Sequence, residues 1–113
     1  MKEKDAIKVL SALAKSTRLN IFRRLVIAGP EGLSVGVIQE ELDLASATLS
    51  FHLKELTHAG LVSARQEGRF VYYAPEIEHM NELVDFLTEN CCQGADSAAC
   101  KPAMKAKCKP VPA

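Results

Sequence analysis

Four cysteines near the end of the chain offer the most distinctive chemistry in the sequence. Cys91 and Cys92 are adjacent, and Cys100 and Cys108 each follow after seven intervening residues. Thiolates are soft donors that select thiophilic acceptors over hard ions, and trivalent arsenic or antimony binds three sulfurs in a pyramid. Adjacent side chains diverge by about 100° within a helix, but they can converge at a frayed helix end.

We therefore predict a three-sulfur site made by Cys91, Cys92 and Cys100. Cys108 is a spare thiol, an alternative third ligand, or a fourth ligand for a tetrahedral ion. The lysines around Cys100 and Cys108 lower thiol pKa values, which favours metal capture and oxidation alike. Another thiophilic metal (cadmium, lead or zinc), thiol oxidation, or no sensing role thus remain alternatives to As(III) or Sb(III).

The composition indicates one small cytoplasmic domain. The chain has 113 residues, 48% of them hydrophobic, and a formal net charge of zero. A DNA-binding protein needs a basic face rather than a positive net charge. The net charge of zero therefore does not exclude DNA binding. No apolar run is long enough for a membrane span and no signal peptide is evident. Thiols stay reduced in the cytoplasm, and their confinement to the last quarter argues against a disulfide framework.

Hydrophobic periodicity predicts a mainly α fold with a β-hairpin. We expect helices over about 4–14, 16–28, 34–42, 46–59 and 76–89, and strands over 61–65 and 70–73. Ser16 and Ser34 are the expected N-caps, and Gly68 supplies the hairpin turn. The expected apolar stripes are Ile7, Leu10, Leu13; Leu19, Phe22, Leu25, Val26; Val35, Ile38, Leu42; Leu49, Leu53, Leu56; and Met80, Leu83, Val84, Leu87.

Two short helices followed by a hairpin form a winged helix-turn-helix of order α-α-α-α-β-β-α, with residues 1–90 as the DNA-binding and dimerisation domain. Residues 91–113 are expected to form a flexible Cys- and Lys-rich tail. In such motifs the N-terminal residues of the second helix meet base edges in the major groove. The expected DNA contacts are Ser46, Ala47, Thr48, Ser50, Phe51, His52 and Lys54, with Arg65 and Arg69 on the wing. A solvated polar helix is the alternative, and His52, about 60° from the leucine face, could instead lie at the core edge.

Three blocks of the sequence resemble ArsR/SmtB repressors. Residues 13–22, LAKSTRLNIF, resemble the stretch L-a-x-p-T-R-l-x-I-l of that family, and residues 47–56, ATLSFHLKEL, resemble its recognition helix. Residues 59–62 and 67–73, AGLV and EGRFVYY, resemble the sequence around its wing. Phe51 and Ala47 depart from the His and Ser of many members, so the base contacts are expected to differ.

The resemblance implies a homodimeric repressor on double-stranded, inverted-repeat operator DNA, released by an inducer. The implied interface lies on the first and fifth helices, whose apolar residues are Ile7, Leu10, Met80, Leu83, Val84 and Leu87. Residues 33–39 lack the thiols of one arsenic-sensing type, and His79 with Asp85 and Glu89 makes a poor zinc set. Residues 90–92, Asn-Cys-Cys, resemble a subset of arsenite sensors of the family, which makes As(III) or Sb(III) the expected inducer.

The sequence does not resemble an enzyme. It has no C-x-x-C motif, no βαβ pattern and no glycine-rich phosphate loop, and we expect no organic cofactor and no membrane partner. A small thiol reductase or a metal-buffering protein is the remaining alternative. Operator-specific binding at physiological salt would exclude the buffering protein.

Overall fold

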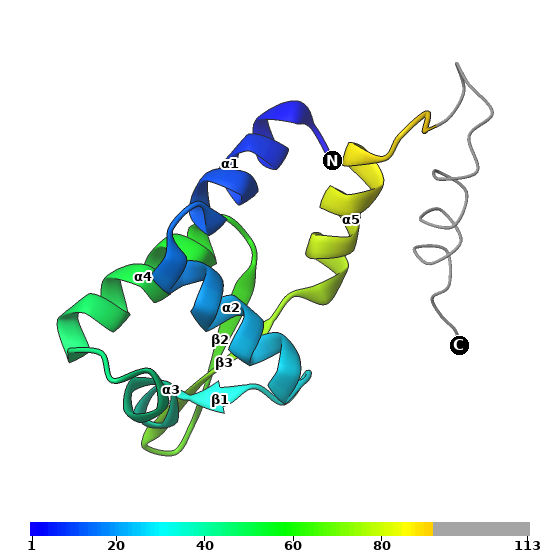
Figure 1. Cartoon of the computed structure of the whole chain (residues 1–113). Helices are drawn as coiled ribbons and strands as arrows, with labels where there is room; N and C mark the ends of the chain where they lie inside the picture. The colour runs from blue at the N-terminus through cyan, green and yellow to red at the C-terminus, as the bar shows by residue number, and fades with distance from the viewer. Residues whose placement is uncertain (92–113) are drawn as a thin grey trace.

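The computed structural model describes residues 1–91. It contains five helices and three strands within this range, in the expected order with one added strand. Their bounds are α1 Glu3–Leu13, α2 Ser16–Ala28, β1 Leu33–Ser34, α3 Val35–Leu42, α4 Ser46–His58, β2 Val62–Glu67, β3 Phe70–Pro75 and α5 Ile77–Leu87. In Figure 1, α1 and α5 lie together at one end, and α3 and the turn between β2 and β3 lie at the other. No helix in the described range has the length and apolar character needed to cross a membrane.

The core is built from one face of each helix, but the buried positions differ partly from those expected. Leu49, Leu53 and Leu56 of α4 are buried, as predicted. On α1 the buried residues are Ala6, Val9 and Ala12, whereas Ile7 and Leu10 are exposed. Two apolar faces coexist on α1, and packing selects the face with small side chains, which allows helices to approach closely.

The second helix also departs from the expected stripe. Ile21, Phe22 and Leu25 are buried, while Leu19 and Val26 are exposed. Ser16 is the first helical residue rather than the cap, because Lys15 holds the extended capping position and makes no side-chain cap. The predicted Ser34 cap is confirmed, since its hydroxyl accepts a hydrogen bond from the Val37 amide at 3.3 Å.

The hairpin belongs to a three-stranded antiparallel sheet of order β1-β3-β2. Sequence reasoning missed β1, a two-residue strand that pairs Leu33 with Tyr73 and Ser34 with Tyr72. A strand of this length has no detectable period. Gly32 makes the pairing possible, because a Cβ at that position would clash with the carbonyl oxygen of Tyr73.

The start of α5 is anchored to the end of α4. The Glu76 amide donates a hydrogen bond to the Leu61 carbonyl at 2.8 Å. Gly60, with φ of +80°, ends the α4 turn directly against the imidazole of His79. Leu83 is buried, and Met80 packs against the core. The position of α5 is therefore linked to the C-terminal end of α4.

Candidate nucleic-acid interface and sensor cysteines

The turn between α3 and α4 sets the direction of α4. Asp43 ends α3 in the left-handed conformation, with φ of 52° and ψ of 54°. The Leu44 amide then donates to the Gln39 carbonyl at 3.2 Å, which satisfies an end carbonyl of α3. An Arg24–Glu41 ion pair at 2.6 Å attaches α3 to α2. Local backbone bonds and one cross-helix ion pair thus add to the apolar packing that holds the helix-turn-helix.

The first turns of α4 expose most of the residues expected to contact DNA. Ser46, Ala47, Thr48, Ser50, Phe51 and Lys54 are exposed. Leu49 and Leu53, on the opposite face, are buried and hold the helix to the core. Small hydroxyl side chains beside one cation and an exposed aromatic ring are suited to phosphate and base-edge contacts.

His52 lies in the core and not on the exposed face. Its side chain is buried, at 7% exposure, and its Nδ1 has no hydrogen-bond partner. Burial lowers the pKa of His52, the nearby charges of Arg18 and Lys15 lower it further, and Glu55 opposes them. The expected DNA contact from His52 is thus replaced by the core-edge alternative, because its position between Leu49 and Leu53 keeps it on the inner side. Its ring meets Phe51 edge-on, with centroids 5.4 Å apart.

The two wing arginines differ in their environments. Arg65 donates from Nε to Glu67 at 2.6 Å and from a terminal nitrogen to the Glu31 carbonyl at 2.9 Å. Its guanidinium also lies 4.8 Å from the centre of the Tyr72 ring. Arg69 is exposed beside Gly68 and has no ion-pair partner within residues 1–91. Sequence reasoning treated the two arginines alike, since the contact of Arg65 with Glu31 joins residues 34 positions apart.

The residues expected at a dimer interface fall into two groups. Ile7, Leu10 and Leu87 are exposed, at 55%, 44% and 57%. Met80 and Val84 are half-buried, and Leu83 is 3% exposed within the core of its own chain. Leu83 therefore supports α5 from beneath and presents no surface to a partner.

The cysteines predicted to form the sensor site lie mostly outside the described residues. Cys91 follows α5, its amide donates to the Thr88 carbonyl at 3.0 Å, and it is disulfide-bonded. Cys92, Cys100 and Cys108 are beyond residue 91, so the three-sulfur site stays a prediction. Within residues 1–91, no three His, Cys, Asp or Glu side chains gather in a way that could hold a metal ion.

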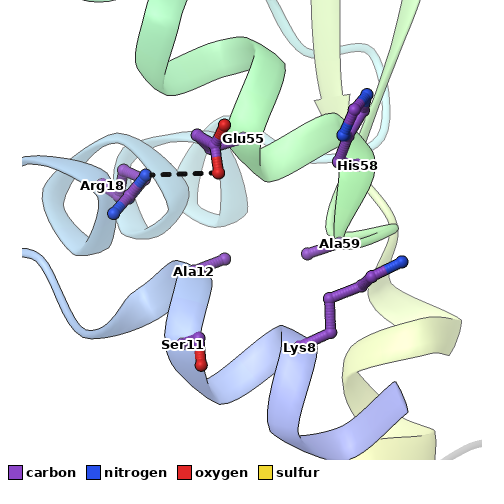
Figure 2. A pocket seen from close by; sticks show the side chains of 7 residues that line it. All are labelled: Lys8, Ser11, Ala12, Arg18, Glu55, His58 and Ala59. Atoms are coloured by element: carbon purple, nitrogen blue, oxygen red, sulfur yellow. Dashed lines mark ion pairs between the residues drawn. The ribbon is translucent and has the colours of Figure 1, made fainter. Parts of the chain in front are cut away.

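A cavity of about 380 Å³ was not foreseen. It lies between α1, α2 and α4 and is lined by charged side chains, among them Lys8, Arg18 and Glu55 (Figure 2). Arg18 was singled out only as part of a motif. No sequence signal joins these residues, because they come from three helices and meet only in the folded chain.

Known proteins resemble this chain over the same region. A family described as helix-turn-helix domain matches residues 13–64. A cadmium resistance transcriptional regulatory protein CadC homolog of Staphylococcus aureus is 36% identical over 72% of this chain, and the match spans 65% of that relative's length. ArsR2 of Halobacterium salinarum, provisionally named an arsenical resistance operon repressor, is 34% identical over 74% of this chain and 71% of its own.

A solved structure adds fold evidence to these sequence matches. HlyU of Vibrio cholerae is 35% identical, with a TM-score of 0.61, over 77% of this chain and 97% of that chain. The sequence motifs, the winged fold and these relatives all indicate the same family. The chain belongs to the ArsR/SmtB family of helix-turn-helix transcriptional regulators.

Proposed function

We propose that this protein is a homodimeric transcriptional repressor of an arsenic-resistance-type operon. It binds an inverted-repeat operator, and As(III) or Sb(III) at its C-terminal cysteines releases it. The observation that carries the DNA-binding part is the exposed polar face over the first turns of α4, backed by buried leucines. Family membership supports the same role.

The recognition surface combines two elements. Ser46, Thr48 and Ser50 on α4 reach phosphates or base edges, and Lys54 adds a cation on the same helix. Arg69, at the hairpin turn, contacts the backbone or the minor groove. Phe51, more than half exposed, offers an apolar surface to a thymine methyl group. Two such surfaces related by a two-fold axis match a palindromic operator.

Exposed apolar residues on α1 and α5 support the dimer. Ile7, Leu10 and Leu87 present large apolar side chains to solvent, and α1 contacts α5 within one chain. A second copy that covers this surface removes apolar area from water, at roughly 25 cal/mol per Å². Because α5 continues into the cysteine segment, a ligand there acts beside the dimer contact.

The donor set supports a thiophilic inducer. Cys91, Cys92 and Cys100 would supply three thiolates, with Cys108 as a further donor, and thiolates select soft ions. The names of two relatives refer to cadmium and arsenical resistance, which supports a soft ion. Cys91 is disulfide-bonded here, so its thiolate becomes available for such an ion after reduction. The ion releases the operator only if it binds the DNA-incompetent arrangement more tightly, and by linkage operator DNA weakens ion binding by the same factor.

Fluorescence anisotropy of the reduced full chain on a labelled inverted-repeat operator tests this function. We expect arsenite to release wild type and to leave Cys91→Ser bound, while Ser63→Ala, on the exposed side of β2, serves as a matched control that is released normally. A chain truncated after Asn90 should bind the operator and ignore arsenite. If the truncated chain fails to bind DNA, then DNA binding and ion sensing are not carried by separate parts of the chain, and that part of the proposal is wrong.

Two alternative inducers are included in the same titration. The cadmium-resistance relative makes Cd²⁺ one alternative, and the disulfide at Cys91 makes thiol oxidation the other. Release by cadmium or diamide, with no response to arsenite, would keep the repressor and replace its inducer. Turnover of a dithiol substrate, or binding without sequence preference, would favour a reductase or a buffering protein.

A further inference from the structure

The cavity between α1, α2 and α4 contains a cation with unused hydrogen-bonding capacity. Arg18 comes from α2, and its side chain is 12% exposed. Within residues 1–91, its Nε is buried without a hydrogen-bond partner. Its ion pair with Glu55 is 3.9 Å long, beyond the range of a hydrogen bond. The Nε–H of Arg18 is therefore an unused donor, in a planar fork that also carries the donors of the two terminal nitrogens.

The cavity around Arg18 is lined by charged and polar side chains together with two alanines. Lys8 and Ser11 line the cavity from α1, and His58 lines it from α4. In Figure 2 the methyl groups of Ala12 and Ala59 face each other across the cavity, so small side chains leave the space open. Glu55 is the single carboxylate in the lining. Two cations, Lys8 and Arg18, thus outnumber the one carboxylate, Glu55.

We propose that this cavity binds a small oxyanion, of the phosphate or carboxylate class, with the Arg18 guanidinium as its anchor. A planar fork of donors matches two oxygens of such an anion. The volume of about 380 Å³ accommodates a few heavy atoms together with bridging waters, because each water occupies about 30 Å³. Lys8, on α1, adds a second positive charge to the lining.

The location favours a free anion over a DNA phosphate. The cavity is lined by the last turns of α4, at Glu55 and His58. The proposed base contacts lie in its first turns, at Ser46 to Phe51. Ten residues of helix separate Thr48 from His58, which corresponds to about 15 Å at 1.5 Å per residue. The cavity therefore does not overlap the proposed base contacts at the start of α4.

His52 provides an internal reporter for this site. Its pKa is lowered by burial and then by the Arg18 and Lys15 charges, so an anion bound at Arg18 offsets part of that positive field. The pKa of His52 should then rise when the cavity is occupied. A merely structural Arg18–Glu55 pair would produce no such response to added anion.

NMR titration of the full-length protein with inorganic phosphate at constant ionic strength, with sodium chloride as balance, tests the proposal. We expect saturable shifts at the amides of Ser11, Ala12 and Ala59, and an upward shift of the His52 imidazole titration. Arg18→Gln should weaken binding about tenfold or more, as expected for loss of a charged hydrogen-bonding partner. Arg23→Gln, an exposed cation on the same helix, is the matched control and should bind phosphate as wild type does.

A second variant covers the case in which Arg18→Gln does not fold. Lys8→Gln changes an exposed residue and should weaken phosphate binding about threefold with an unchanged fold. A parallel titration with succinate separates a phosphate site from a carboxylate site. Shifts that do not saturate, that appear equally with chloride alone, or that persist unchanged in both variants would overturn the proposal.

Discussion

Arg65 of β2 lies over the ring of Tyr72 of β3, with the guanidinium carbon 4.8 Å from the ring centre. The same guanidinium reaches the Glu31 carbonyl, 34 residues away in sequence. Arg65 therefore attaches the wing to the loop before β1. The two wing arginines therefore differ, because Arg65 already makes two hydrogen bonds and a ring contact within residues 1–91, whereas Arg69 does not.

The first prediction follows from that difference. Arg69→Ala should weaken operator binding. It should also reduce the slope of log Kd against log salt concentration by about one, as expected for a lost phosphate contact. Its free energy of unfolding should not change. Arg65→Ala should lose about 1 kcal/mol of stability, from the exposed cation–π contact and hydrogen bonds, and should leave the salt slope unchanged. If Arg65→Ala reduced this slope and Arg69→Ala did not, Arg65 rather than Arg69 would be the phosphate contact.

The second prediction concerns the junction of α4 and α5. Gly60 has φ of +80°, and a Cβ there would lie 3.0 Å from Nε2 of His79. Gly60→Ala should reduce the free energy of unfolding by about 1–2 kcal/mol, because a side chain strains the left-handed backbone, and displacement of His79 should add to this loss. Urea unfolding measures the change. Gly36→Ala is the control, since Gly36 lies in α3 with nothing within 4 Å of its Cβ position, and it should be neutral or stabilise by about 0.5 kcal/mol.

The third prediction concerns the dimer surface. Ile7→Glu places a charge on an exposed apolar position of α1, so burial against a partner would become unfavourable. The protein should then behave in light scattering as a monomer of 12.3 kDa and should bind the inverted repeat weakly. Val37→Glu alters an apolar side chain exposed on α3 and should leave the dimer intact. An unchanged mass for Ile7→Glu would remove α1 from the interface.

The fourth prediction concerns the pH dependence of stability through His52. Its folded pKa lies below the ordinary value of 6.5, because burial disfavours the imidazolium and Arg18 and Lys15 oppose it, while Glu55 acts in the other direction. At pH values between the folded and the unfolded pKa of His52, the unfolded state binds more protons than the folded state. The free energy of unfolding therefore rises with pH in that interval. The contribution is complete above about pH 6.5 and is lost as the pH falls toward the folded pKa.

Urea unfolding between pH 5 and 8 measures this effect. His52→Gln should flatten the dependence, whereas His58→Gln should retain it, since His58 is exposed. If the two variants show the same slope as wild type, the buried imidazole is not the group responsible.

The sequence by itself determined the order of the five helices and the hairpin, the Ser34 cap and the buried leucines of α4. These features arise from local spacing, capping and turn chemistry, which act within about one or two turns of chain. The family motifs likewise identified the recognition helix and the wing. The predicted set of cysteine ligands is still based on the sequence alone, because only Cys91 falls within the described residues.

Tertiary structure decided which of two apolar faces on α1 and α2 enters the core, and it turned His52 inward between Leu49 and Leu53. It also paired the two-residue β1 with β3, engaged Arg65 with Glu31 and Tyr72, and enclosed Arg18 in a charged cavity. Apart from the Arg65–Tyr72 contact within the hairpin, these outcomes depend on contacts between residues far apart in sequence. No local period encodes them, because close packing chooses among faces that the chain presents equally well.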